Sequence, residues 1–571
     1  MEINEIIQTE WDAIIIGTGM GGGAAGYELA KAGKKVLFCE KGKSHLTNKK
    51  MIDGAYAEDF FNNKEKKDFT KIDILANSGR WFEKIIDGSN KKPFSYTPFA
   101  GCGTGGSSTL YGMIMQRFSP DDFNPKSNFS DAFDSTVPDS WPISYDQLRP
   151  YYKEIENLFA VKGEIDPIRS QFLDPIMPRP TIAKEDFSLN LNQYFKKIGL
   201  HPYQPPLACD LIKDCNHCQG YICAKNCKND STKIFIKPAL ENHGAYLLDE
   251  CCVTKLDADK NIVNQVIGIR GGNEIILKGK IIILAAGALE TPHLLFNSKS
   301  NIWPNGLANS SGHVGKNLMR NFYDLFFIFH NQPNILPDVP KELYLTDFYT
   351  TTEQKLGIIQ SFGHLSPQAV LEGLETDIEN SNFKFLKPLF RLSKPLLFKY
   401  IKRKLASAFI LVSTMEDLPY KENMVLDNSK EKSKISIQYK VHTYDKNRIE
   451  LFRKKIKKIL KPYKFFMLKQ AEQNKNFIAL ACGTCRMGND PINSVINAEN
   501  RAHDITNLYI VDGSFFPTNP GLNSGLTVAA NAMRVARNIL KRKNIATIKL
   551  TAEKKQTKEV QDQTELLTFI R

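Results

Sequence analysis

A glycine-rich turn between two short apolar segments near the start of the chain constrains the fold most. Residues 11–17 form an apolar, β-branched run of strand length, "GTGMGGGAAGYELAKAGKK" follows, and "VLFCEKG" reads as a second strand. Gly17, Gly19 and Gly22 give the pattern G-x-G-x-x-G, in which the glycines allow a tight turn, backbone approach to a pyrophosphate and close helix–strand packing. Glu40 ends the second strand, where a carboxylate can bind ribose hydroxyls. The pattern predicts a dinucleotide-binding βαβ unit in an α/β fold.

The glycine motif alone does not separate NAD from FAD, and five further blocks do. In order they are "GCGTGGSSTLYGMIMQRFSPDDF", "AAGALETPHLLFNS", "GHVGKNLM", "CGTCRMGNDP" and "NLYIVDGSFFPTNPGLNSGLTVAANAMRVA". This order and spacing resemble the glucose–methanol–choline (GMC) family of FAD-dependent oxidoreductases. "MEDLPYKENMVLD" further resembles the branch with gluconate and other sugar-type dehydrogenases. The resemblance implies a Rossmann-type FAD-binding domain and an α+β substrate-binding domain.

The chain is long enough for two structural units, because its 571 residues exceed what one core usually serves. We expect a discontinuous FAD-binding domain from residues 1–60, 97–130, 231–330 and 478–541. Residues 61–96, 131–230 and 331–477 then form the substrate-binding or cap domain, and residues 542–571 a polar tail.

The resemblance also assigns residues to the cofactor. It implies FAD on Gly17, Gly19, Gly22 and Glu40. The remaining positions carried over from the family blocks are Gly105, Gly106 and Ser107 along the pyrophosphate and flavin, Val253 at the adenine, Asp512 and Gly513 at the pyrophosphate–ribityl stretch, and Asn523 and Thr527 near the isoalloxazine.

One position departs from the family pattern at the expected catalytic base. Most members carry a histidine three residues before the glycine of the "GT" turn, and its pKa of about 6.5 suits proton transfer. That position here is Leu480, while Asn523 matches the family's partner asparagine. Three explanations stay open. Another residue such as His364 supplies the base, Tyr111 orients a substrate, or the reaction needs no strong base.

Two groups of cysteines suggest redox or metal chemistry. Cys215, Cys218, Cys223 and Cys227 are spaced C-x2-C-x4-C-x3-C, close to an iron–sulfur or zinc pattern without matching it. We prefer the interpretation that they are free thiols to the alternative that they bind iron–sulfur or zinc. We therefore assign no residue as a metal ligand. Cys485 lies in the family's "GTCRMG" turn and Cys482 directly precedes it, so the two are not expected to form a redox pair.

Charge and hydropathy limit location and partners. The net charge is +14, and the segment 383–404, "FKFLKPLFRLSKPLLFKYIKRK", interleaves eight lysines and arginines with apolar residues and has no acid. Such a segment suits an anionic membrane surface, or alternatively helices whose cations point to water. The start of the chain has no signal-peptide pattern and no run is long enough to span a bilayer. We expect a cytoplasmic protein without a nucleic-acid partner. If segment 383–404 binds a membrane surface, the protein is peripheral on the inner face of the membrane.

These observations lead to one expected function and one alternative. We expect an FAD-dependent oxidoreductase that oxidises a CH–OH group of an alcohol, polyol or sugar-like substrate by hydride transfer to flavin N5. A dehydrogenase that passes electrons to a quinone or another acceptor is preferred over an oxidase. The alternative is a flavin-binding electron-transfer protein that does not oxidise alcohols, because Leu480 replaces the expected histidine.

Overall fold

The computed structural model describes most of the chain. The described residues are 2–61, 69–89, 93–178, 186–212, 215, 217–329, 341–350, 354–379, 384–428, 434–471 and 480–542. The expected polar tail lies outside them except for Arg542. None of the described helices combines the length and the apolar character needed to cross a membrane.

A parallel sheet of five strands carries the amino-terminal glycine turn. Its order is β18 (Leu508–Ile510), β10 (Ile282–Leu284), β2 (Ala13–Ile16), β3 (Val36–Cys39) and β6 (Tyr246–Leu248), and every pairing is parallel. All residues of β2 and β3 are buried, as expected for strands covered on both faces. Helix α2 (Met20–Lys31) follows β2 directly. The predicted Rossmann-type α/β fold is therefore confirmed.

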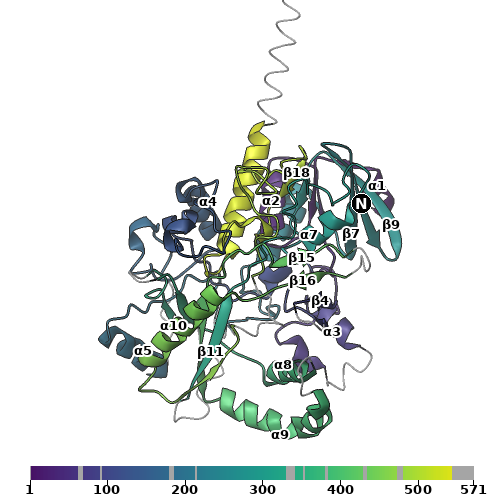
Figure 1. Ribbon diagram of the computed structural model, residues 1–571. Helices are drawn as coiled ribbons and strands as arrows, with labels where there is room; N and C mark the ends of the chain where they lie inside the picture. Colours follow the sequence, from purple (N-terminus) through teal and green to yellow (C-terminus); the bar gives the residue numbers. More distant parts are fainter. Residues whose placement is uncertain are drawn as a thin grey trace, which may run out of the picture.

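A helix over residues 525–542 closes this part of the molecule, shown in yellow in Figure 1. Its Arg537 pairs with Glu28 of α2 at 3.1 Å and with Glu154 of α4 (Tyr145–Leu158) at 2.6 Å. A second sheet, in the order β1 (Glu10–Trp11), β9 (Asn273–Gly279), β8 (Val263–Arg270) and β7 (Cys251–Ala258), extends beside the parallel sheet. Ion pairs of Arg537 thus join the helix over residues 525–542 to α2 and α4, which are far from it in sequence.

An antiparallel sheet forms the other half of the molecule. Its order is β12 (Tyr344–Leu345), β13 (Gly357–Ser361), β14 (Ala408–Met415), β11 (Phe322–Phe329) and β17 (Phe465–Leu468). Helices α5 (Asp186–Lys197) and α10 (Thr443–Ile459) share a hydrophobic core with it. Helices α8 (Pro367–Glu379) and α9 (Lys387–Leu405) are inserted between β13 and β14 and lie at the lower edge of Figure 1.

A four-stranded sheet and several short helices complete the fold. The sheet runs in the order β15 (Met424–Leu426), β16 (Ser436–Gln438), β4 (Ile85–Asp87) and β5 (Phe94–Tyr96). The remaining helices are α1 (Ile3–Gln8), α3 (Lys71–Asn77), α6 (Lys237–His243), α7 (Glu290–Asn297), η1 (Ala57–Phe60), η3 (Gly106–Thr109), η4 (Pro120–Phe123), η5 (Pro125–Asn128), η6 (Ser170–Phe172), the π-helical η7 (Thr232–Ile236), η8 (Lys384–Leu386) and η9 (Gly513–Phe515).

A buried ion network ties the antiparallel sheet to the rest of the chain. Lys355 lies between Asp122 of η4 at 2.7 Å and Glu416, just after β14, at 2.9 Å, and all three side chains are almost fully buried. A Cβ at Gly521 would stand 2.5 Å from the amide nitrogen of Glu416, so only glycine fits there. The backbone that leads into Asn523 therefore packs directly against Glu416 of this network.

Candidate active site

The three glycines of the first turn serve three different structural purposes. Gly17 has φ +99°, and a Cβ on it would meet the carbonyl oxygen of Ala285 at 2.3 Å. A Cβ on Gly22 would stand 2.0 Å from the carbonyl oxygen of Gly17, so this glycine allows helix and strand to pack. A Cβ on Gly19 would meet no atom within 4 Å. The open position is the one that the motif reserves for a pyrophosphate.

Glu40 holds this turn in place from the end of β3. Its Oε2 accepts hydrogen bonds from the Thr18 amide at 3.2 Å and the Thr18 hydroxyl at 2.5 Å, and its Oε1 accepts from the Gly42 amide at 3.0 Å. Burial raises the pKa of the Glu40 carboxyl, while these hydrogen bonds lower it. Oε2 uses both of its lone pairs in these bonds, whereas Oε1 accepts only one of them and so keeps a lone pair that can accept a ribose hydroxyl.

The second glycine loop packs against the first. The Gly105 amide donates to the Thr18 hydroxyl at 3.0 Å, and a Cβ on Gly106 would stand 3.1 Å from Cα of Gly19. The hydroxyl of Ser107, which belongs to η3, accepts from the Gly101 amide at 2.9 Å. The structure thus brings together Gly19, Gly105 and Gly106, which the sequence assigned to one ligand.

Asp512 and Gly513 approach the same edge of the sheet from β18. Asp512 accepts hydrogen bonds from the Gly287 amide at 3.0 Å, the Thr291 hydroxyl at 2.5 Å and the Ser514 amide at 2.8 Å. Burial raises the pKa of its carboxyl. The carbonyl of Gly513 accepts from the Gly483 amide at 3.1 Å, which joins this segment to the "GTCRMG" turn. Both segments therefore border the predicted cofactor site.

The arrangement suits FAD. The glycine turns lie at the carboxyl ends of parallel strands, where open α/β sheets bind ligands. Gly19 and Gly287 both leave the Cβ position empty, and the Thr104 hydroxyl is buried with no hydrogen-bond partner among the described residues. Val253 lies half-buried in β7, which starts beside Glu40 through a hydrogen bond from the Cys251 amide to its carbonyl at 2.9 Å. These residues form a backbone-lined cradle with a carboxylate at each end.

Asn523 lies where the parallel-sheet half meets the antiparallel sheet. Its side-chain amide donates to Oε1 of Gln360 in β13 at 3.2 Å. The hydroxyl of Tyr344 in β12 is buried without a hydrogen-bond partner among the described residues, and burial raises its pKa. Thr527 is fully buried and its hydroxyl is hydrogen-bonded to that of Tyr152 at 2.9 Å. Sequence reasoning missed Gln360 and Tyr344 because no recognisable motif surrounds either residue.

Leu480 takes the family's histidine position with an uncommon backbone. Its φ is +59° and 37% of its surface is exposed. His364, the suggested replacement base, is exposed as well. Its backbone carbonyl accepts from the Tyr56 hydroxyl at 3.0 Å, and its ring interacts with the carboxylate of Asp59. Among the described residues, no hydrogen bond joins the His364 ring to Asn523.

Tyr111, Cys482 and Cys485 are packing residues. The hydroxyl of the half-buried Tyr111 donates to the carbonyl of Asn229, which orients it toward the protein interior. Cys482 and Cys485 are buried free thiols, and burial raises the pKa of both. These positions support the turn and offer no accessible nucleophile.

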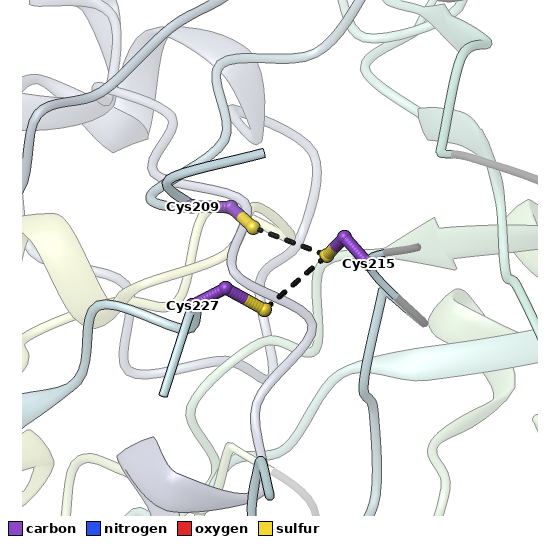
Figure 2. Close-up of side chains that lie close together, drawn as sticks. All are labelled: Cys209, Cys215 and Cys227. Atoms are coloured by element: carbon purple, nitrogen blue, oxygen red, sulfur yellow. Dashed lines mark hydrogen bonds between the residues drawn. The ribbon is translucent and has the colours of Figure 1, made fainter. Parts of the chain in front are cut away.

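The cysteine-rich segment folds into a compact group of sulfurs. Cys215 Sγ lies 3.6 Å from Cys209 Sγ and 3.4 Å from Cys227 Sγ, and all three sulfurs lie within 4.8 Å of one another (Figure 2). Cys223 Sγ lies 3.5 Å from Cys227 Sγ. The three mutually close sulfurs therefore include Cys209, which the four-cysteine spacing omits, while Cys218 contacts the group only through Cys223.

Three comparisons with known proteins agree with this geometry. The family model described as GMC oxidoreductase matches residues 88–322 and 419–532, and the model described as FAD binding domain matches residues 12–50.

Two curated relatives align with nearly the whole chain. The paromamine 6'-oxidase of Streptomyces fradiae is 24% identical over 93% of this chain and 91% of its own length. The 2-methyl-1,2-propanediol dehydrogenase of Mycolicibacterium austroafricanum is 25% identical over 93% of this chain and 95% of its own. A solved formate oxidase variant from Aspergillus oryzae has a TM-score of 0.63 at 14% identity, covering 93% of this chain and 98% of the other. The solved structure thus shares the fold of this chain.

Proposed function

Since the chain belongs to the GMC oxidoreductase family, we propose that it oxidises the CH–OH group of a small alcohol, polyol or sugar-like substrate with FAD. The proposal rests on one observation, namely that the glycine cradle and Asn523 belong to the same region of the molecule. The glycine cradle fits FAD, and Asn523 lies where the cradle half of the molecule meets β13 of the antiparallel sheet. The two relatives support the substrate class, because one is named as an oxidase of paromamine and the other as a dehydrogenase of 2-methyl-1,2-propanediol.

The cradle residues would hold the cofactor by its phosphates and sugars. Gly19, Gly105 and Gly106 let backbone amides approach the pyrophosphate, and the amino terminus of α2 adds its dipole. Glu40 and Asp512 offer carboxylate oxygens to sugar hydroxyls. When bound, FAD supplies a two-electron acceptor for the hydride of the carbinol carbon.

The substrate hydroxyl would be held by amides and a phenol instead of a histidine. Asn523 and Gln360 already form a hydrogen-bonded pair, and Tyr344 keeps its proton because burial raises its pKa. None of these three groups is a strong base at neutral pH. As the C–H bond breaks, the carbonyl forms and the hydroxyl proton passes to water. Position and hydrogen bonding, rather than general-base catalysis, then account for the rate.

We propose a dehydrogenase with a quinone or another small electron acceptor, working in the cytoplasm or on the inner face of the membrane. The sugar-dehydrogenase-like block and the basic segment around α9 support it.

We expect the purified holoprotein to have a yellow flavin spectrum. Under anaerobic conditions, some members of a panel of alcohols, polyols and sugars should bleach it. The control is Asn523→Ala, which should keep the yellow spectrum and bleach slowly. A flavin that no alcohol bleaches would instead support the alternative of an electron-transfer flavoprotein. Absence of flavin after purification and after incubation with FAD would refute both.

A specific observation supports a second, metal-binding role for the cysteines. Tetrahedral zinc with Zn–S bonds of about 2.3 Å places its sulfurs about 3.8 Å apart. The spacings of 3.6 and 3.4 Å around Cys215 are close to this value. We propose that Cys209, Cys215 and Cys227 bind one thiolate-preferring ion, and an iron–sulfur cluster is the competing occupant. Elemental analysis should give about one zinc per chain, lost in Cys215→Ser. Iron with sulfide, or neither metal, would refute the zinc assignment.

A further inference from the structure

One face of helix α9 presents an apolar stripe to solvent. Leu389, Leu392, Leu396 and Tyr400 are exposed over 64%, 80%, 73% and 61% of their surfaces. Their spacing of three and four residues places them on one side of the helix. The helix lies at the edge of the molecule in Figure 1, and none of its residues is buried. Contiguous exposed apolar side chains of this kind mark interaction surfaces.

The opposite face of α9 is fixed on α8. Arg391 pairs with Glu375 at 2.7 Å, and Lys394 pairs with Glu372 at 3.1 Å and also with Glu375. Phe390, Leu397 and Ile401 lie on this inner side and are half-buried. The exposure of the outer stripe is therefore a consequence of how the helix is attached, because turning it inward would break these ion pairs.

Cations flank the outer stripe. Lys399, Lys402 and Arg403 are exposed, and no described carboxylate lies within ion-pair distance of them. From residue 384 to residue 405 the chain contains no aspartate or glutamate. The outer face of α9 thus combines leucines, an aromatic ring and an uncompensated positive charge. We call this combination the α9 surface.

We propose that the α9 surface docks the protein on an anionic lipid bilayer, with the helix lying in the plane of the interface. Leucine and tyrosine side chains enter the headgroup and acyl boundary, while lysine and arginine bind anionic headgroups. A symmetric contact with a second copy would place like charges opposite one another, which opposes that arrangement. The helix does not cross the membrane, since its 19 residues include seven lysines and arginines.

The position of α9 in the fold gives docking a consequence. The α8–α9 hairpin connects β13, which carries Gln360, to β14. Docking therefore holds the antiparallel sheet, and with it the Asn523 region, near the bilayer surface. The binding itself is a property of the surface and does not depend on the proposed oxidation.

Vesicle sedimentation with the full-length holoprotein tests the inference. We expect binding to vesicles of phosphatidylcholine with 30% phosphatidylglycerol, weak binding to pure phosphatidylcholine, and loss of binding in high salt. The variant Lys399→Gln/Arg403→Gln should bind about 30-fold more weakly, from the typical contribution of each surface cation. The variant Leu392→Glu/Leu396→Glu should bind at least about 100-fold more weakly, because two apolar anchors are removed.

The matched control is Ile492→Glu, an equally exposed apolar residue (73%) outside α9, which should bind like the wild type. In Leu392→Trp, quenching of the new tryptophan by brominated lipid should report insertion directly. Three results would overturn the inference. They are no binding to anionic vesicles, unchanged binding by the two α9 variants, or a dimer in solution that these variants convert to a monomer.

Discussion

The substitution Gly19→Ala should separate cofactor binding from folding. Gly19 has φ −62° and ψ −171°, which any residue adopts, and an added Cβ would meet no atom within 4 Å. Reduced freedom of the unfolded chain favours alanine by about 0.4–1 kcal/mol. Alanine is a poorer residue at the start of a helix by about 0.5–1 kcal/mol. The two effects offset each other, so the apoprotein should retain its stability within about 1 kcal/mol.

FAD binding should respond quite differently to the same methyl group. It would stand where the pyrophosphate approaches the backbone at the amino terminus of α2, so the two cannot occupy the same volume. We expect the Kd for FAD to rise at least about 100-fold, which corresponds to about 2.7 kcal/mol. Titration followed by flavin fluorescence measures this change, and thermal unfolding of the apoprotein followed by tryptophan fluorescence measures stability.

The comparison variant is Gly22→Ala, whose Cβ would stand 2.0 Å from the carbonyl oxygen of Gly17. Strand or helix must then move by more than an ångström, and we expect a loss of about 3 kcal/mol or more in stability. The reasoning fails if Gly19→Ala destabilises the apoprotein as much as Gly22→Ala does. It also fails if Gly19→Ala binds FAD within threefold of the wild type.

Four further outcomes are expected. Asn523→Ala should lower kcat/KM about 100-fold with its flavin spectrum unchanged, as measured by steady-state kinetics, because the hydroxyl of the substrate loses its amide partner. The kcat/KM should vary less than about threefold from pH 6 to 8, since the buried Tyr344 has a raised pKa and stays protonated; a histidine base would give a tenfold fall per pH unit below its pKa. Leu480→His should raise kcat/KM at pH 8 at least about tenfold, with Leu480→Gln as the matched control. Lys355→Met should destabilise the fold by about 3–5 kcal/mol in denaturant unfolding, because it leaves Asp122 and Glu416 buried without their cation.

The cofactor-binding half could be predicted from the sequence because its motifs consist of residues that are close together in the chain. A turn that requires φ +99° at Gly17 and a close approach at Gly22 permits few residues, so the glycines themselves report the backbone geometry. Glu40 follows the second strand at the position expected for a ribose-binding acid. These features depend on neighbouring residues rather than on the rest of the fold.

The residues of the proposed substrate site could not be predicted from the sequence, because contacts between distant parts of the chain bring them together. Gln360 meets Asn523 across 163 residues, and an isolated glutamine in an apolar strand carries no pattern. The cysteine group shows the same limit. Cys209 pairs with Lys228 in an isolated antiparallel bridge, which brings it next to Cys227. A spacing rule that counts only sequential neighbours selects Cys218 instead.

The backbone at Leu480 bears on how the missing base is interpreted. A left-handed φ of +59° is costly for leucine by about 1 kcal/mol, whereas asparagine, aspartate and histidine adopt it more readily. The turn is held by hydrogen bonds from outside it, between Cys482 and Met319 and between Gly483 and Gly513. The turn therefore has a conformation that suits histidine better than the residue it contains. Introducing histidine should leave the fold intact, so any gain or lack of activity in that variant reports on proton transfer and not on a disturbed backbone.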